Sequence, residues 1–161
     1  MESLTEPNIQ EILKGKCCPY CHCGTELVTG DLIYPERAAD DPRLYYLYKK
    51  YYRCIIDKSH YVGTYADNRT SHGRLADSEL RELKNQGHGI FDPLWKNKSH
   101  FKNSREAYQW LSKMMELPKK RTHFGMFTVE ECKRAIGFCQ ELVNETETLS
   151  QKRKKETDPK T

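Results

Sequence analysis

Apolar residues in the first half of the chain come in short runs separated by turn residues, a pattern typical of strands. Five tyrosines crowd residues 44–53, which favours a strand running into Cys54, with a short helix over 42–49 as the alternative. A small antiparallel sheet is therefore expected. Its strands are predicted over 25–29 and 32–34, which form a hairpin about Gly30-Asp31, and over 44–53 and 61–65.

From about residue 76 onward the apolar period becomes helical. Asp77 or Ser78 can cap the first helix, and a break is expected near Asp92-Pro93 because proline lacks the amide hydrogen. Ser104 is expected to cap a second helix that runs to about Glu116. The residues predicted to face inward are Leu80, Leu83, Gly87, Ile90, Phe91 and Leu94 in the first helix, and Ala107, Leu111 and Met114 in the second.

The last helix has the clearest signal. Thr128 and Glu131 form a capping box, in which each side chain accepts a hydrogen bond from the other residue's amide. The final stretch from Gln151 has no apolar residue, so a disordered charged tail is predicted over 149–161. One apolar stripe is predicted along this helix, made of Val129, Cys132, Ile136, Cys139 and Val143.

The composition is that of a hydrophilic chain with little apolar material to bury. Charged residues make up 31% of the 161 residues, and the mean hydropathy is −0.88. No apolar run approaches the roughly 18 residues of a membrane span, and the first residues do not resemble a secretory signal. These features predict an intracellular, cytoplasmic protein with no membrane partner, in which a metal can stabilise a thin core.

Two short groups of residues of the types that bind metals are separated by 33 positions, counted from Cys21 to Cys54. Cys18-Pro-Tyr-Cys21 places two thiolates on one turn, and Cys54 and His60 supply a second pair. Zinc prefers four tetrahedral nitrogen or sulfur ligands at about 2.0–2.3 Å. Seven cysteines in a reducing compartment favour a metal over disulfides. The sequence therefore predicts one structural Zn²⁺ held by Cys18, Cys21, Cys54 and His60.

The fourth ligand has alternatives in the sequence. Asp57 gives the tighter Cys-X2-Asp spacing, but a carboxylate oxygen is a less usual ligand of structural zinc than nitrogen or sulfur. A shifted register would instead use Cys23, Cys17 or His22. Cys132 and Cys139, seven positions apart on an apolar helix face, are interpreted as core residues.

These patterns together predict an α+β fold in which a zinc-ribbon-like antiparallel sheet is followed by about three packed helices. The lead-in, residues 1–16, can hold a short helix over 7–14. The ribbon module is expected over 17–75, and a helical module packed on it over 76–148.

Positive charge suggests a polyanionic partner. Between residues 96 and 134 there are ten basic and four acidic residues, although an ordinary solvated surface explains the same surplus. The tyrosines of 44–53 could stack on bases while neighbouring cations meet phosphates, although ordinary strand packing also explains them. The residues predicted to contact nucleic acid are Lys49, Lys50, Arg53, Lys119, Lys120 and Arg121.

Several motifs in combination resemble one known family: Cys18-Pro-Tyr-Cys21, Tyr61-Val-Gly-Thr64, Leu75-Ala-Asp-Ser-Glu-Leu-Arg81, His88-Gly-Ile-Phe-Asp-Pro-Leu-Trp95, Arg105-Glu-Ala-Tyr-Gln-Trp-Leu111 and His123-Phe-Gly-Met-Phe-Thr-Val-Glu-Glu-Cys132. Over roughly residues 17–142 the chain is similar to the bacterial and phage zinc-finger-containing domain family. The resemblance implies a ribbon followed by helices, a bound zinc with Cys18, Cys21 and Cys54 as ligands, and no established catalysis. That family usually has a fourth cysteine before its Tyr-Val-Gly strand, where this chain offers Asp57 or His60.

The sequence favours binding over catalysis. A zinc with four protein ligands lacks the open position that catalytic zinc uses, and the chain has no H-E-x-x-H motif, nucleophile elbow or phosphate loop. We therefore expect an accessory module that binds nucleic acid, with a protein-interaction adaptor of a phage or mobile element as the alternative. A metal-dependent nuclease is disfavoured, and no small-molecule substrate is evident.

Overall fold

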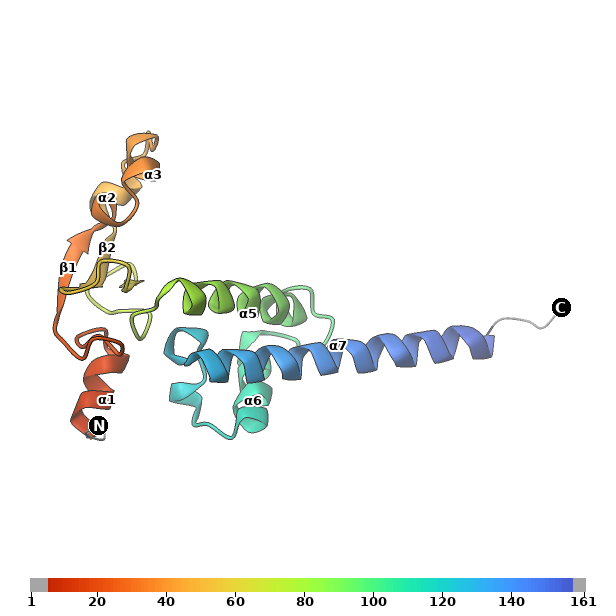
Figure 1. The fold of residues 1–161 in the computed structure, drawn as a ribbon. Helices are drawn as coiled ribbons and strands as arrows, with labels where there is room; N and C mark the ends of the chain where they lie inside the picture. The colour runs from red at the N-terminus through yellow and green to blue at the C-terminus, as the bar shows by residue number, and fades with distance from the viewer. Residues whose placement is uncertain (1–5, 158–161) are drawn as a thin grey trace. The chain divides into compact units, whose positions relative to one another are not determined.

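The computed structural model describes residues 6–157 (Figure 1). The chain divides into two compact units, the first ending at Glu82 and the second beginning at Leu83, where the sequence predicted a boundary at 75/76. A three-stranded antiparallel sheet precedes the long helices, which confirms the predicted α+β fold. None of the described helices is long and apolar enough to cross a membrane.

The sheet of the first unit has the order β1-β2-β3. β1 (Thr25–Thr29) pairs antiparallel with β2 (Lys50–Cys54), and β2 pairs with β3 (Tyr61–Gly63). In this register Thr25 lies opposite Cys54. The strand pairing therefore brings the end of β2 beside the segment that follows Cys18 and Cys21. One buried cluster of this unit consists of Cys18, Tyr52, Cys54, Val62 and Leu75.

The predicted hairpin about Gly30-Asp31 is wrong. Gly30 begins a short helix, α2 (Gly30–Ile33), and β1 pairs with β2 instead of with residues 32–34. A return strand there would have been very short, since Pro35, which has no amide hydrogen to give to a sheet, begins the next helix. The connection from β1 to β2 is therefore helical, with α2, α3 (Pro35–Ala39) and α4 (Tyr45–Tyr48) in succession (Figure 1).

The tyrosine-rich segment combines both structures that the sequence allowed. Tyr45 to Tyr48 form α4, and the strand begins only at Lys50. The Tyr34 ring makes edge contacts with Tyr46, Tyr51 and Tyr61, and the Tyr61 hydroxyl donates a hydrogen bond to the Tyr34 hydroxyl at 3.0 Å. These contacts fasten the helical connection to the sheet.

The polypeptide before β1 runs from α1 (Glu6–Leu13), the short helix that the sequence allowed in the lead-in. Within residues 9–13 of this helix, Ile12 and Leu13 are buried. Gly15 follows with φ of +75°, and its α-carbon faces Ser71, so only glycine fits this turn without strain. The turn leads directly into the segment that carries Cys17 and Cys18. Here the backbone of Cys17 forms an isolated antiparallel β-bridge with Gly24.

The second unit contains most of α5 (Ser78–Lys96), together with α6 (Ser104–Met115) and α7 (Val129–Thr157). Two short 3₁₀ turns, η1 (Lys119–Arg121) and η2 (Phe124–Met126), join α6 to α7. The buried apolar residues of this unit are Phe91, Leu94, Ala107, Leu111, Met115, Phe124, Phe127, Cys132, Ala135 and Cys139.

The predicted break at Asp92-Pro93 does not occur, and α5 continues to Lys96. The amide of Asn97 donates to the Pro93 carbonyl at 3.0 Å, so helical hydrogen bonding resumes after the proline. A proline ring crowds the carbonyl four residues earlier, and that residue is Gly89, whose notional β-carbon has nothing within 4 Å beyond its chain neighbours and the backbone of its own helix. The open surroundings of Gly89 give the backbone room to accommodate the ring.

The starts of α5 and α6 were predicted to within one residue. Asp77 caps α5 by accepting the Leu80 amide at 2.9 Å, but α6 is capped by Asn103, not by Ser104. Asn103 is the better cap because its side-chain oxygen reaches the Glu106 amide at 3.0 Å. Met115 is buried in α6 where Met114 was predicted, four positions after Leu111.

The capping box of α7 is confirmed. The Thr128 amide donates to Glu131 Oε1 at 3.0 Å, and the Glu131 amide donates to Thr128 Oγ1 at 3.2 Å. Where the sequence predicted a disordered tail over 149–161, the structure continues α7 through Thr157, and residues 158–161 lie outside the described part. Figure 1 shows the end of α7 running on alone, and residues 144–153 are all exposed.

Candidate metal centre

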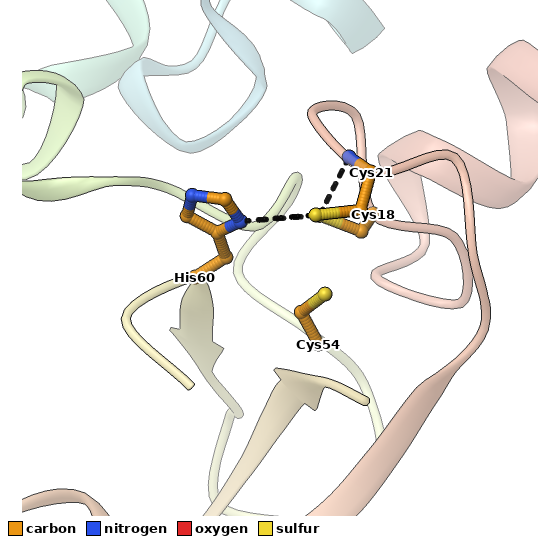
Figure 2. A group of neighbouring side chains, drawn as sticks. All are labelled: Cys18, Cys21, Cys54 and His60. Carbon is orange, nitrogen blue, oxygen red and sulfur yellow. Dashed lines mark hydrogen bonds between the residues drawn. The ribbon is translucent and has the colours of Figure 1, made fainter. Parts of the chain in front are cut away.

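Four donor atoms converge in the first unit. The sulfurs of Cys18, Cys21 and Cys54 and a ring nitrogen of His60 all lie within 4.8 Å of one another (Figure 2). His60 Nδ1 is 3.5 Å from Cys18 Sγ and 3.8 Å from Cys21 Sγ. Cys18 and Cys21 come from the turn before β1, Cys54 ends β2, and His60 directly precedes β3.

These spacings suit a tetrahedral ion. Bond lengths of about 2.0–2.3 Å to nitrogen and sulfur make the edges of such a tetrahedron about 3.5–3.8 Å long. The two measured sulfur–nitrogen distances, 3.5 and 3.8 Å, fall in that range. Three soft sulfurs with one imidazole are also a donor set of structural zinc sites. The residues therefore fit a zinc ion in both geometry and chemistry.

Backbone amides point at two of the sulfurs. The Cys21 amide lies 3.5 Å from Cys18 Sγ (Figure 2). The amides of Ile56 and Asp57 lie 3.4 and 3.3 Å from Cys54 Sγ. Burial by itself would raise the pKa of the Cys54 thiol, but these two amides, with help from neighbouring thiols, lower that pKa to about 6. The second turn is thus built to carry a thiolate.

The other sulfurs resist ionisation when no cation is present. Burial, followed by the neighbouring Cys54 and Cys18 sulfurs, raises the pKa of the Cys21 thiol to about 12. Burial likewise raises the pKa of Cys18, which has no exposed surface. Three thiolates cannot share this space without a positive charge among them. A divalent cation would supply that charge, so the electrostatics of the cluster favour a bound metal ion.

His60 is oriented by its surroundings. Its Nδ1 faces the sulfurs, while Nε2 lies 3.5 Å from Asp57 Oδ2, which favours the tautomer that leaves the Nδ1 lone pair free for a metal. The Tyr20 ring packs 4.4 Å from the imidazole, centroid to centroid. The Tyr20 hydroxyl accepts the Asp77 amide at 3.1 Å, which fixes the ring in place.

Asp57 stands behind the histidine and outside the group of four. One of its carboxylate oxygens faces His60 Nε2, and the other accepts hydrogen bonds from the amide and hydroxyl of Ser59. Among the described residues, the group of converging donors includes His60 and omits Asp57. Nitrogen is also the more usual zinc donor. The geometry thus favours His60 over Asp57 as the fourth ligand.

The residues of the shifted register lie around the group. Cys17 directs its thiol to the Cys18 carbonyl oxygen at 3.8 Å, and His22 is exposed with φ of +57°. Cys23 is closer, with its sulfur 3.4 Å from Cys54 Sγ, yet it is not one of the four converging donors. Nothing in the sequence pattern distinguished Cys23 from Cys17.

The basic residues predicted on β2 are partly engaged within the protein. Arg53 forms an ion pair with Glu26 at 2.8 Å, and its side chain is only 11% exposed. The Lys49 ammonium donates to the Thr64 carbonyl oxygen. Lys50 is half-buried. Tyr52, for which the sequence allowed either base stacking or ordinary strand packing, is buried.

The basic residues predicted in the second unit lie on η1. Lys119 and Lys120 are exposed, whereas Arg121 is half-buried and pairs with Glu131 at 3.5 Å. The basic residues of β2 and those of η1 belong to different units.

Comparison with known proteins gave one family. Residues 14–142 match the family described as a zinc-finger-containing domain, and the match covers most of the chain. No curated protein and no solved structure matched the chain.

Proposed function

Since the chain belongs to the zinc-finger-containing domain family, we propose that Cys18, Cys21, Cys54 and His60 hold a single structural zinc ion. The observation that supports this is the convergence of four donors within 4.8 Å of one another, with the two distances from His60 Nδ1 to the Cys18 and Cys21 sulfurs in the range of a zinc tetrahedron. When bound, the zinc neutralises the thiolates and cross-links the turn before β1 to the turn after β2. With four protein donors the site has no open position for a substrate, so its role is structural.

Metal analysis of the purified protein tests the ligand set. We expect one zinc per chain, lost in Cys54→Ser and in His60→Ala and retained in Cys17→Ser. Cys17 is the matched control because it neighbours Cys18 and lies outside the group of four. Equal zinc content in Cys54→Ser and the wild type would overturn the assignment.

The zinc-stabilised chain, we further propose, binds nucleic acid through its second unit. The supporting observation is the partition of charge. Residues 1–82 have 11 basic and 13 acidic residues, whereas residues 83–161 have 16 basic and 10 acidic residues. The whole positive surplus of the chain thus falls in the helical unit, and phosphate backbones are attracted to such a surplus.

One end of α6 is the best candidate contact surface. Lys119 and Lys120 project from η1, which packs against α6. Arg134 from α7 reaches the Met115 carbonyl at the end of α6, at 3.5 Å. Arg121 is less available because it pairs with Glu131. The two lysines are therefore the residues of this surface most able to meet phosphates.

Binding to labelled single- and double-stranded DNA and RNA, measured over a range of salt, tests this proposal. We expect Lys119→Gln/Lys120→Gln to weaken binding and to reduce the salt slope by about 0.9 for each duplex phosphate that is no longer neutralised. The control, Lys14→Gln/Lys58→Gln, removes the same charge from exposed lysines of the first unit. Equal weakening by both pairs would refute the η1 surface, and no binding at low salt would refute nucleic-acid binding altogether.

A protein-interaction adaptor is the second candidate function, favoured by one observation. The helical connection between β1 and β2 exposes a group of large apolar side chains, and such side chains are common anchors at protein interfaces. A stoichiometric protein partner that no longer binds when Tyr48, 69% exposed, is changed to Ser would support this function. The exposed apolar residues are Leu32, Leu44, Tyr45, Leu47 and Tyr48.

A further inference from the structure

A fifth sulfur lies against the candidate metal centre. Cys23 Sγ is 3.4 Å from Cys54 Sγ, although Cys23 is outside the group of four converging donors. This separation is a van der Waals contact between two free thiols, whereas a disulfide bond is about 2.05 Å long. The two sulfurs can therefore bond after a small movement.

The backbone holds Cys23 in this place. Its carbonyl accepts the Cys18 amide at 2.8 Å, and the Gly24 carbonyl accepts the Ile55 amide at 3.4 Å. Cys23 and Gly24 are thus hydrogen-bonded to Cys18 and to Ile55, the residue after Cys54. Cys23 is half-buried, so small oxidants can reach the pair from solvent.

We propose that Cys23 and Cys54 form an oxidation site, in which a hydroperoxide joins them by a disulfide and removes Cys54 from the metal-binding set. This proposal rests on the zinc assignment above, because it requires Cys54 to be a ligand. The resulting loss of one donor leaves Cys18, Cys21 and His60, and a site with three donors holds zinc less tightly. A thiol reductant reverses the change.

The reaction balances with hydrogen peroxide as the only oxidant. Cys54 Sγ attacks one peroxide oxygen, the O–O bond breaks, and the departing hydroxide takes a proton to become water. Cys54 is then a sulfenic acid. Cys23 Sγ attacks that sulfur and loses its proton, the S–O bond breaks, and a second water leaves. The two sulfurs together lose two electrons, which reduce one peroxide to two waters.

Position explains why Cys23 would react in place of the other spare cysteines. Cys17 is half-buried like Cys23, but its thiol is directed to the Cys18 carbonyl oxygen at 3.8 Å. Cys132 and Cys139 are buried and belong to the second unit. Cys23 is thus the cysteine outside the group of four whose sulfur contacts Cys54.

Zinc release from the full chain, loaded with zinc, tests the proposal. The protein is treated with hydrogen peroxide while a chromogenic chelator reports free zinc, and peptide mass spectrometry then identifies the disulfides. We expect a Cys23–Cys54 disulfide in the wild type. Cys23→Ser should bind one zinc as before and release it severalfold more slowly, and the matched control Cys17→Ser should release it at the wild-type rate.

The outcomes separate this proposal from the zinc assignment. Release from Cys23→Ser at the wild-type rate, or a disulfide only between other cysteines, overturns the oxidation site and leaves the zinc site standing. If Cys23→Ser cannot bind zinc at all, Cys23 is a ligand and both proposals fall. A purified wild type without zinc contradicts the zinc assignment and, with it, the loss of a zinc ligand on oxidation, while the disulfide mapping still decides whether Cys23 pairs with Cys54.

Discussion

Gly87 in α5 lies where the helix meets the Phe124 ring. A β-carbon at this position would lie 2.1 Å from Phe124 Cε1, and Phe124 is itself buried. The glycine therefore serves close packing within the second unit. Gly89, two positions later, has no neighbour within 4 Å of its notional β-carbon.

These two glycines make a matched test. We expect Gly87→Ala to destabilise the second unit by about 1–3 kcal/mol, because the ring cannot make room without disturbing the core. Gly89→Ala should stabilise the protein by up to about 1 kcal/mol, because alanine is the better helix former. Urea unfolding of each variant measures both effects, and equal effects would contradict the packing argument.

Cys139 gives the stability of the second unit a dependence on alkaline pH. Burial raises the pKa of its thiol to about 12, whereas an unfolded cysteine ionises near 8.5. Between these values the unfolded chain binds fewer protons than the folded one, so the stabilising contribution is complete below about pH 8.5 and is lost as pH rises.

The difference in unfolding free energy between the wild type and Cys139→Ala should therefore shrink from pH 8 to pH 11. The slope approaches about 1.4 kcal/mol per pH unit when one proton is involved. The smaller side chain costs the same at every pH, so it does not affect the slope. A difference that stays constant over this range would show that the thiol remains protonated in the unfolded chain or is not protected in the folded one.

The candidate zinc ligands show how much of the site could be predicted from the sequence. Cys-X2-Cys spacing alone pointed to Cys18 and Cys21, because the two sulfurs share one turn. The choice between Asp57 and His60 needed coordinates, since both follow Cys54 within one loop and only the fold shows which one faces the sulfurs. The contact of Cys23 with Cys54 depends on strand register, which spacing does not encode.

Among the elements, α7 depends on its first turn. Thr128→Ala removes the hydroxyl that accepts the Glu131 amide, so we expect a loss of about 0.5–2 kcal/mol. The control is Thr148→Ala on the exposed part of the same helix, where the hydroxyl only donates to the Asn144 carbonyl. It should change stability little. Thermal unfolding compares the two, and a larger loss for Thr148→Ala would contradict the role of the cap.

Helices with strong local signals were predictable, and elements set by distant contacts were not. Thr128 and Glu131 lie three positions apart, so their capping box could be read directly. Pro93 misled the prediction because its effect depends on the space around Gly89. The predicted hairpin failed because β1 pairs with β2, some twenty positions further along the chain, and local propensity cannot reveal such a pairing.

On the scale of the whole molecule, the two units should respond differently to metal removal. One buried cluster of the first unit includes Cys18 and Cys54 of the candidate centre, and in small metal-binding modules the free energy of metal binding is a large part of the folding free energy. The buried apolar residues of the second unit include Phe91, Phe124 and Phe127, and this unit places no residue in the group of four.

A strong chelator should therefore unfold residues 1–82 and leave the helices of the second unit folded. Hydrogen exchange followed by mass spectrometry measures this, with fast exchange expected in β1, β2 and β3 and continued protection in α6. Adding zinc should restore protection. Retained protection of β2 in the zinc-free protein would show that the first unit folds without its metal.

The pairing of Thr29 with Lys50 has one more consequence. This pairing holds together the two ends of the twenty-residue connection between β1 and β2. The tip of the connection, from Ala39 to Tyr45, is almost wholly exposed. Lengthening a loop whose ends are held together costs little entropy, about 0.6 kcal/mol for each doubling. Foreign peptides inserted at this tip should be tolerated, which makes the site suitable for displaying an epitope or a fluorescent reporter.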